Sequence, residues 1–74
     1  MTRQIADYCK SNIPNYEARL MAALDAMQER RCDLRTADWK LADDIEKAST
    51  EWADKHGYAV DFLDGIDVDE IINA

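Results

Sequence analysis

Turn-forming residues are scarce in this 74-residue chain, which contains only two glycines and one proline. Proteins built from many short strands need frequent sharp turns, and glycine and proline supply most of them. Apolar side chains instead recur every three or four residues, the spacing that places them on one face of a helix. The sequence therefore predicts an all-α fold, a small helical bundle formed as one domain by residues 1–74.

The first long helix is expected at residues 15–31, directly after Pro14, because proline is favoured where a helix starts. Its apolar stripe consists of Tyr16, Leu20, Ala23, Leu24 and Met27. The opposite face carries small and weakly polar side chains, namely Ala18, Met21, Ala22 and Asp25. A helix with two such faces is typical of the centre of a bundle or of an interface, and we expect the central position.

The second long helix is expected at residues 36–56, antiparallel to the first, with Asp33 or Thr36 as its N-cap. Gly57 is a strong stop signal, and Tyr58 is placed to make the apolar contact that accompanies a Schellman ending. The buried stripe of this helix consists of Leu41, Ala42, Ile45, Ala48 and Trp52, with His56 as a further candidate. Ion pairs at i,i+4 spacing indicate a solvated outer face, and they join Asp43 to Lys47 and Glu51 to Lys55.

Two short helices are expected to cover the stripe shared by the long pair. One spans residues 3–11 and the other spans residues 67–73, where Asp67 and Glu70 resemble a capping box. An edge strand at residues 58–62, completed by a partner, is an alternative for the preceding segment. The predicted core consists of Ile5, Tyr8, Ile13, Tyr16, Leu20, Leu24, Met27, Leu41, Ile45, Trp52 and some of Phe62, Leu63 and Ile72.

The acidic segment at residues 58–74 contains Asp64-Gly65, a dipeptide typical both of calcium loops and of β-hairpins. An EF-hand loop with Gly65 at its sixth position would place apolar side chains at ligand positions, including Val60 at the first and Ile71 at the twelfth. A two-residue hairpin turn would mix acids with large apolar groups on both faces, which suits no core. We therefore predict a turn that ends at Gly65 and is followed by a helix.

No arrangement of residues typical of an enzyme or a metal site is found in the sequence. His56 is the only histidine, no motif places a nucleophile near it, and it suits a helix C-terminus through its interaction with the helix dipole. Cys9 and Cys32 lack the spacing of a zinc site, and we expect free thiols, at least one of them partly buried, in a cytoplasmic protein. We therefore predict no catalytic activity, no metal and no cofactor.

The chain carries a formal net charge of −7, which is distributed unevenly. Residues 1–55 hold nine basic and eleven acidic side chains, whereas residues 56–74 hold five acidic and no basic ones. Direct binding to nucleic acid is not expected, because phosphate binding requires Lys and Arg. No apolar run is long enough to cross a membrane. The expected partner is therefore a protein with a basic surface.

The residues expected to contact such a partner are acids of the C-terminal segment together with apolar anchors. They are Asp61, Asp64, Asp67, Asp69, Glu70, Trp39, Met21 and Phe62. Trp39 lies off the apolar stripe of its helix. We therefore expect equally that another element covers it as part of the core or that it contacts a partner. A basic cluster of Arg30, Arg31 and Arg35 is interpreted as complementing a helix dipole and pairing with neighbouring acids, rather than as a docking site.

The function expected from these features is that of a small, acidic, non-catalytic protein-binding module. In size, acidity and lack of catalytic motifs the chain is similar to inhibitors from phages and mobile elements, including anti-CRISPR proteins. We therefore expect an inhibitor that occludes the basic surface of a nucleic-acid-handling protein. One alternative is a homo-oligomeric assembly subunit joined through the small-residue face of the first long helix, and another is an antitoxin-like regulator of a basic partner. The simpler interpretation of the acids is that they keep the chain soluble.

Overall fold

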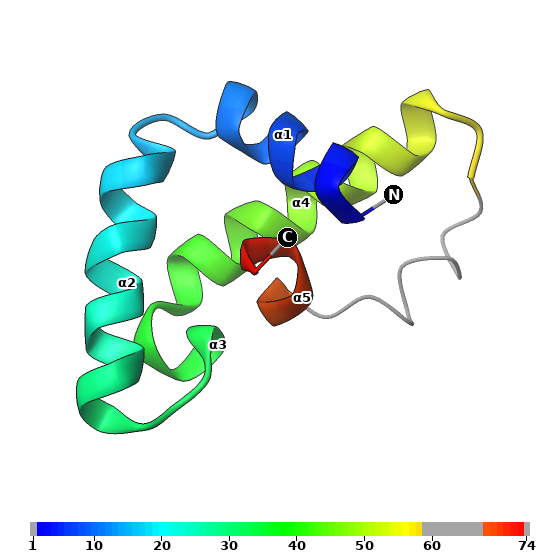
Figure 1. Ribbon diagram of the computed structural model, residues 1–74. Coiled ribbons are helices and arrows are strands. Elements are labelled where there is room, and N and C mark those ends of the chain that lie inside the picture. The colour runs from blue at the N-terminus through cyan, green and yellow to red at the C-terminus, as the bar shows by residue number, and fades with distance from the viewer. Residues whose placement is uncertain (1, 59–67, 74) are drawn as a thin grey trace.

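The computed structural model describes residues 2–58 and 68–73, and within these residues the chain forms five helices and no strand (Figure 1). The all-α fold class predicted from the sequence is therefore confirmed. None of the helices in the described ranges is long and apolar enough to cross a membrane. The helices are α1 (Thr2–Asn12), α2 (Tyr16–Arg30), α3 (Leu34–Ala37), α4 (Trp39–Lys55) and α5 (Val68–Ile72).

The connection between α1 and α2 contains the turn that Pro14 indicated. Ile13 still donates its backbone N–H to the Cys9 carbonyl at 2.8 Å, which extends the hydrogen bonding of α1 by one residue. Asn15 then has a φ of 56°, a left-handed conformation that asparagine tolerates better than most residues. Because α2 begins at the next residue, Tyr16, the start predicted at residue 15 is correct to within one residue.

The second long helix, predicted at residues 36–56, is interrupted near its start. Asp38, with a φ of −153°, takes a more extended conformation between α3 and α4. Each helix has its own N-cap, because Asp33 Oδ1 accepts a hydrogen bond from the Thr36 N–H at 2.9 Å and Asp38 Oδ1 accepts one from the Leu41 N–H at 3.1 Å. The predicted cap Asp33 is thus confirmed for α3, whereas the cap of α4 is one that the sequence analysis missed.

The C-terminus of α4 ends as Gly57 and Tyr58 predicted. Gly57 has a φ of 75°, and its N–H donates to the Asp54 carbonyl at 3.3 Å. The Tyr58 N–H donates to the Ala53 carbonyl at 2.9 Å, and these two bonds define a Schellman motif. The Tyr58 ring stacks on the Trp52 ring with their centroids 5.4 Å apart, which supplies the expected apolar contact.

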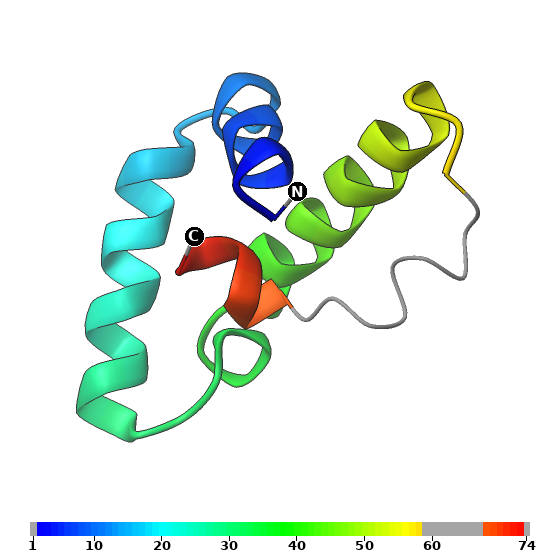
Figure 2. The ribbon, with the colours of Figure 1, turned by 45° about the vertical axis from the view of Figure 1, so that its right-hand side comes forward.

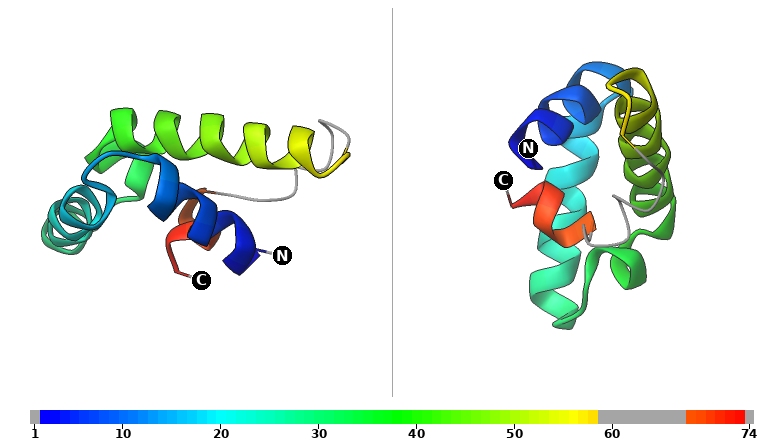
Figure 3. Two further views of the ribbon diagram at one scale, coloured as in Figure 1. Left: turned by 90° about the horizontal axis from the view of Figure 1, so that it is seen from above. Right: turned by 90° about the vertical axis from the view of Figure 1, so that its right-hand side faces the viewer.

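α4, and not α2, is the central helix of the fold. α1 and α3 pack on α4, and α5 packs on α1 and α4, whereas α2 contacts mainly α3 and to a smaller extent α1. The chain runs along α2 and returns along α4, but these helices diverge, so that the expected antiparallel pair is present only loosely (Figure 2). Viewed from above, α2 lies at one edge of the molecule (Figure 3). The expectation that this helix occupies the centre of the bundle is therefore wrong.

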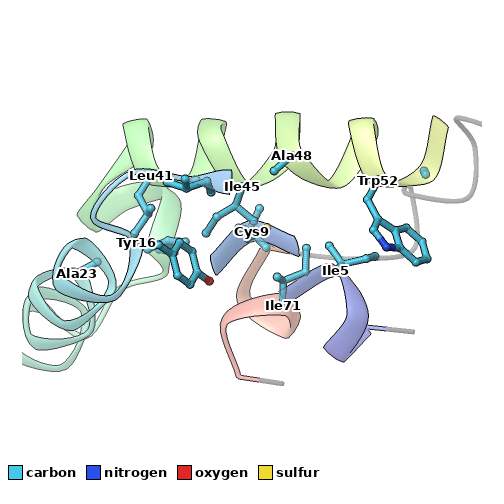
Figure 4. Close-up of a cluster of buried hydrophobic side chains, with 14 residues drawn as sticks. Ile5, Cys9, Tyr16, Ala23, Leu41, Ile45, Ala48, Trp52 and Ile71 are labelled. Atoms are coloured by element: carbon cyan, nitrogen blue, oxygen red, sulfur yellow. The ribbon is translucent and has the colours of Figure 1, made fainter. Parts of the chain in front are cut away.

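The core lies where α1, α4 and α5 meet, and α2 reaches it along one narrow strip (Figure 4). α4 buries seven side chains, whereas α2 buries only Tyr16 and Ala23. Leu24, predicted to be core, is 38% exposed, because it lies about 100° around the helix from Ala23. Buried as predicted are Ile5, Ile13, Tyr16, Leu41, Ile45 and Trp52, and partly buried are Tyr8, Leu20, Met27 and Ile72.

Five further side chains belong to the core although the sequence analysis did not place them there. They are Cys9, Leu34, Ala53, Val68 and Ile71. Cys9 and Cys32 are free thiols, and because Cys9 is fully buried the expectation for the cysteines is confirmed. The remaining core candidates, Phe62 and Leu63, lie outside the described residues, as do the expected edge strand and the turn at Gly65.

Candidate protein-binding surface

The eight residues predicted to contact a partner divide into two groups. Asp61, Phe62, Asp64 and Asp67 lie outside the described residues, so the structure says nothing of them. Met21, Trp39, Asp69 and Glu70 are described, and they come from α2, α4 and α5. The described part of the predicted surface therefore consists of these four residues and their neighbours.

Asp69 contributes to the fold as well as to the charge of the chain. Its Oδ1 accepts a hydrogen bond from the Leu34 N–H at 3.2 Å, and the two groups are partly buried. Leu34 is the first residue of α3, where backbone N–H groups lack partners within the helix. Asp69 thus fastens α5 to the start of α3, whereas Glu70, its neighbour in the first turn of α5, is exposed.

Trp39 is the largest exposed apolar side chain in the described part of the chain, at 65% exposure. The cap formed by Asp38 fixes where α4 begins and therefore places Trp39 at the first position of that helix. Its indole lines a groove between α2 and α4, whose other lining residues are Arg19, Lys40, Asp43, Asp44 and Lys47. Of the two interpretations weighed for Trp39, exposure in a groove supports the interface.

The charges of this groove are largely paired with one another. Arg19 Nη1 on α2 lies 2.9 Å from Asp44 Oδ2 on α4, which joins the two helices across the groove. Lys47 Nζ lies 3.0 Å from Asp43 Oδ2, so the i,i+4 pair predicted there is confirmed, and this hydrogen bond raises the pKa of Lys47. With Lys40 the groove holds three bases and two acids, so it does not extend the predicted acidic surface.

A second apolar surface lies on an exposed flank of α2, beside its buried stripe. Met21 is 69% exposed and Leu24 is 38% exposed, one helical turn apart. Ala18 and Ala22 beside them are also exposed. The sequence analysis named Met21 but missed Leu24, which it assigned to the core. The position of Leu24 at the margin of its apolar stripe is the signal from which its exposure could have been inferred.

The basic cluster near the end of α2 is arranged differently from the prediction. Arg35 pairs with Glu46 at 3.0 Å, and the neighbouring acid Asp33 caps α3. The hydrogen bonds with Thr36, and to a smaller extent the charge of Arg35, lower the pKa of Asp33. Arg30 and Arg31 are exposed at the C-terminus of α2, where a positive charge suits the helix dipole. Arg31 has a left-handed φ of 52°.

Burial disfavours the ionised forms of two side chains in the core, those of Cys9 and Tyr16. Burial raises the pKa of the Cys9 thiol to about 11, against a smaller lowering by its hydrogen bond with Ser49, so the reactive thiolate is disfavoured. Burial likewise raises the pKa of Tyr16 to about 12.

The only histidine, His56, stacks on Trp52 with centroids 4.3 Å apart, and its Nδ1 lies 2.8 Å from the Trp52 carbonyl oxygen. These contacts hold the His56 side chain against Trp52 at the C-terminal end of α4.

Comparisons with known proteins find no matching family model, no matching curated protein and no matching solved structure. The function must therefore be inferred from the surface itself. That surface combines an exposed tryptophan in a groove, an apolar strip on α2 and a large negative net charge.

Proposed function

We propose that the chain is a small, non-catalytic protein-binding module that inhibits a nucleic-acid-handling protein by occluding its basic surface. The observation that carries this proposal is the exposure of Trp39 beside a groove between α2 and α4. A domain of this size has few large apolar side chains with which to build a core, so leaving a tryptophan outside it costs stability. Tryptophan is also enriched among the residues that contribute most to protein–protein binding.

The net charge of −7 supports a basic partner. Charges exposed to solvent act over a Debye length of about 8 Å at physiological salt, so such a field mainly guides the approach and orientation of the partner. Within the groove itself bases outnumber acids. We therefore expect the close attraction to come from the face of the Trp39 ring, which favours an Arg or Lys side chain of the partner.

The mechanism requires only that the bound chain covers the surface on which nucleic acid would lie. Small size and acidity support an inhibitor of the kind found in phages and mobile elements, including anti-CRISPR proteins, acting in the cytoplasm. No group of three His, Cys, Asp or Glu side chains suited to a metal ion occurs within residues 2–58 and 68–73, so the inhibition we propose invokes no metal there.

The experiment begins with capture of the tagged chain's partners from its host, followed by titration of the main partner in purified form. Trp39→Ala should weaken binding about tenfold or more, because a buried interface tryptophan contributes at least about 1.4 kcal/mol. Thr50→Ala is the control at an exposed, uncharged position of α4 that does not line the groove, and it should change binding much less. Binding should also weaken as salt rises, and nucleic acid should compete with the chain. Binding that is insensitive to salt and unchanged by Trp39→Ala would overturn the proposal.

A further inference from the structure

One flank of α2, about 100° around the helix from its buried stripe, carries an ordered row of exposed residues. We call this row, formed by Glu17, Met21, Leu24 and Gln28, the α2 outer face. Its members follow one another at intervals of four, three and four residues, the spacing that two packed helices share along a common seam. All four are exposed, and Glu17 also pairs with Lys10 of α1 at 2.7 Å.

The α2 outer face is complementary to itself when two copies run in opposite directions. An antiparallel arrangement with its two-fold axis between Met21 and Leu24 places each of these residues against the other in the second copy. At each end of the pair, Glu17 of one copy then lies near Gln28 and Arg31 of the other. A parallel arrangement would instead place like charges side by side. The antiparallel arrangement also opposes the two helix dipoles favourably.

We propose that a second copy of this chain docks on the α2 outer face, forming an antiparallel two-fold dimer. Met21 and Leu24 lie at the centre of this contact, and Glu17 and Arg31 pair at its two ends. α2 has 15 residues and is therefore about 22 Å long, so the contact is small and the dimer dissociates at low concentration. The inference is independent of the inhibitory function proposed above, because Trp39 lies in a groove and not on this face.

Salt separates self-association from binding to a basic partner. Each copy carries a net charge of −7, so two copies repel each other, and raising the salt concentration screens this repulsion. Dimer formation should therefore strengthen with salt, whereas binding to a basic partner should weaken. The opposite signs allow one of the two proposals to fail while the other stands.

The test is sedimentation equilibrium of the full chain from about 10 μM to about 1 mM protein. The average mass should rise from 8.5 kDa toward twice that value. Met21→Glu and Leu24→Glu should each keep the mass at that of the monomer, because a charge is then buried at the centre of the contact without a partner. Trp39→Ala, the control for loss of an exposed apolar side chain elsewhere, should leave the dimer intact. A wild-type mass that stays at 8.5 kDa throughout, or a dimer unaffected by both Glu substitutions, overturns the proposal.

A charge exchange tests the antiparallel direction. Glu17→Arg and Arg31→Glu should each weaken the dimer about fivefold, because each change removes an ion pair at both ends of the contact. The double variant restores both pairs and the net charge, and its dimer constant should return to within about twofold of the wild type. Glu17 also pairs with Lys10 of its own chain at 2.7 Å, so thermal unfolding of every variant is measured to verify the fold. Additive weakening in the double variant overturns the antiparallel arrangement.

Discussion

Replacing Asp69 with alanine should loosen the attachment of α5 to α3. The carboxylate accepts a hydrogen bond from the Leu34 N–H at 3.2 Å in a partly buried position. A hydrogen bond to a charged group contributes about 1.5–3 kcal/mol, and the length and partial exposure of this one put it at the lower end or below. We therefore expect the free energy of unfolding to fall by about 1 kcal/mol, which corresponds to a decrease in Tm of about 4–8 °C for a domain of this size.

The chain offers a closely matched control in Glu70→Ala. Both acids lie in the first turn of α5, so both substitutions remove one negative charge and one favourable interaction with the helix dipole. Glu70 is exposed, and its replacement should change the free energy of unfolding by less than about 0.5 kcal/mol. The difference between the two variants measures what the Asp69 side chain contributes beyond its charge, including its contact with α3.

Amide hydrogen exchange examines the bond itself. The Leu34 N–H is held by Asp69, so Asp69→Ala should accelerate its exchange about fivefold, the factor that corresponds to about 1 kcal/mol. Glu70→Ala should leave that rate unchanged. Equal Leu34 exchange rates and equal Tm values in the two variants would refute the structural role of Asp69 and return it to the set of acids available to a partner.

Three further predictions concern backbone strain and buried groups. Arg31→Gly should stabilise the fold against urea by about 0.5–1 kcal/mol, because the left-handed φ of 52° is strained for arginine, whereas Asn15→Gly at 56° should change little. The Cys9 thiol should react with a thiol reagent far more slowly than Cys32, since burial raises its pKa to about 11, and equal rates would contradict this. Stability should fall as pH rises from about 9 to about 11, because Cys9 loses its proton earlier in the unfolded chain, with a usual pKa of 9.0, than in the folded chain. A decline that is equally steep in Cys9→Ala would refute that assignment.

Features set by neighbouring residues could be predicted from the sequence. Gly57 and Tyr58 define the end of α4 because a Schellman motif involves only the last turn of a helix and the two residues beyond it. The break at Asp38 is also local, but the apolar pattern conceals it. Leu34 and Leu41 are seven residues apart, the spacing of about two turns in a continuous helix, so the pattern gives no sign of the interruption between them.

Features that depend on distant parts of the chain could not be predicted. The contact between Asp69 and Leu34 joins residues 35 positions apart, and no pattern near either residue indicates it. The place of α2 is similar, because a weakly polar helix face is compatible with burial and with exposure. α4, on which α1 and α3 pack, occupies the central position that α2 was expected to take, and Met21 on α2 is exposed.

The contact between α1 and α5 has a consequence for the order of events when the chain is synthesised. α1 precedes α5 in the chain, but two of the residues that close its core, Val68 and Ile71, come from α5. α4 can cover one side of Ile5 and Cys9 as soon as it has left the ribosome, but the side covered by α5 stays open until α5 has followed. A ribosome that stalls before residue 68 therefore leaves a chain whose core lacks the side chains of α5.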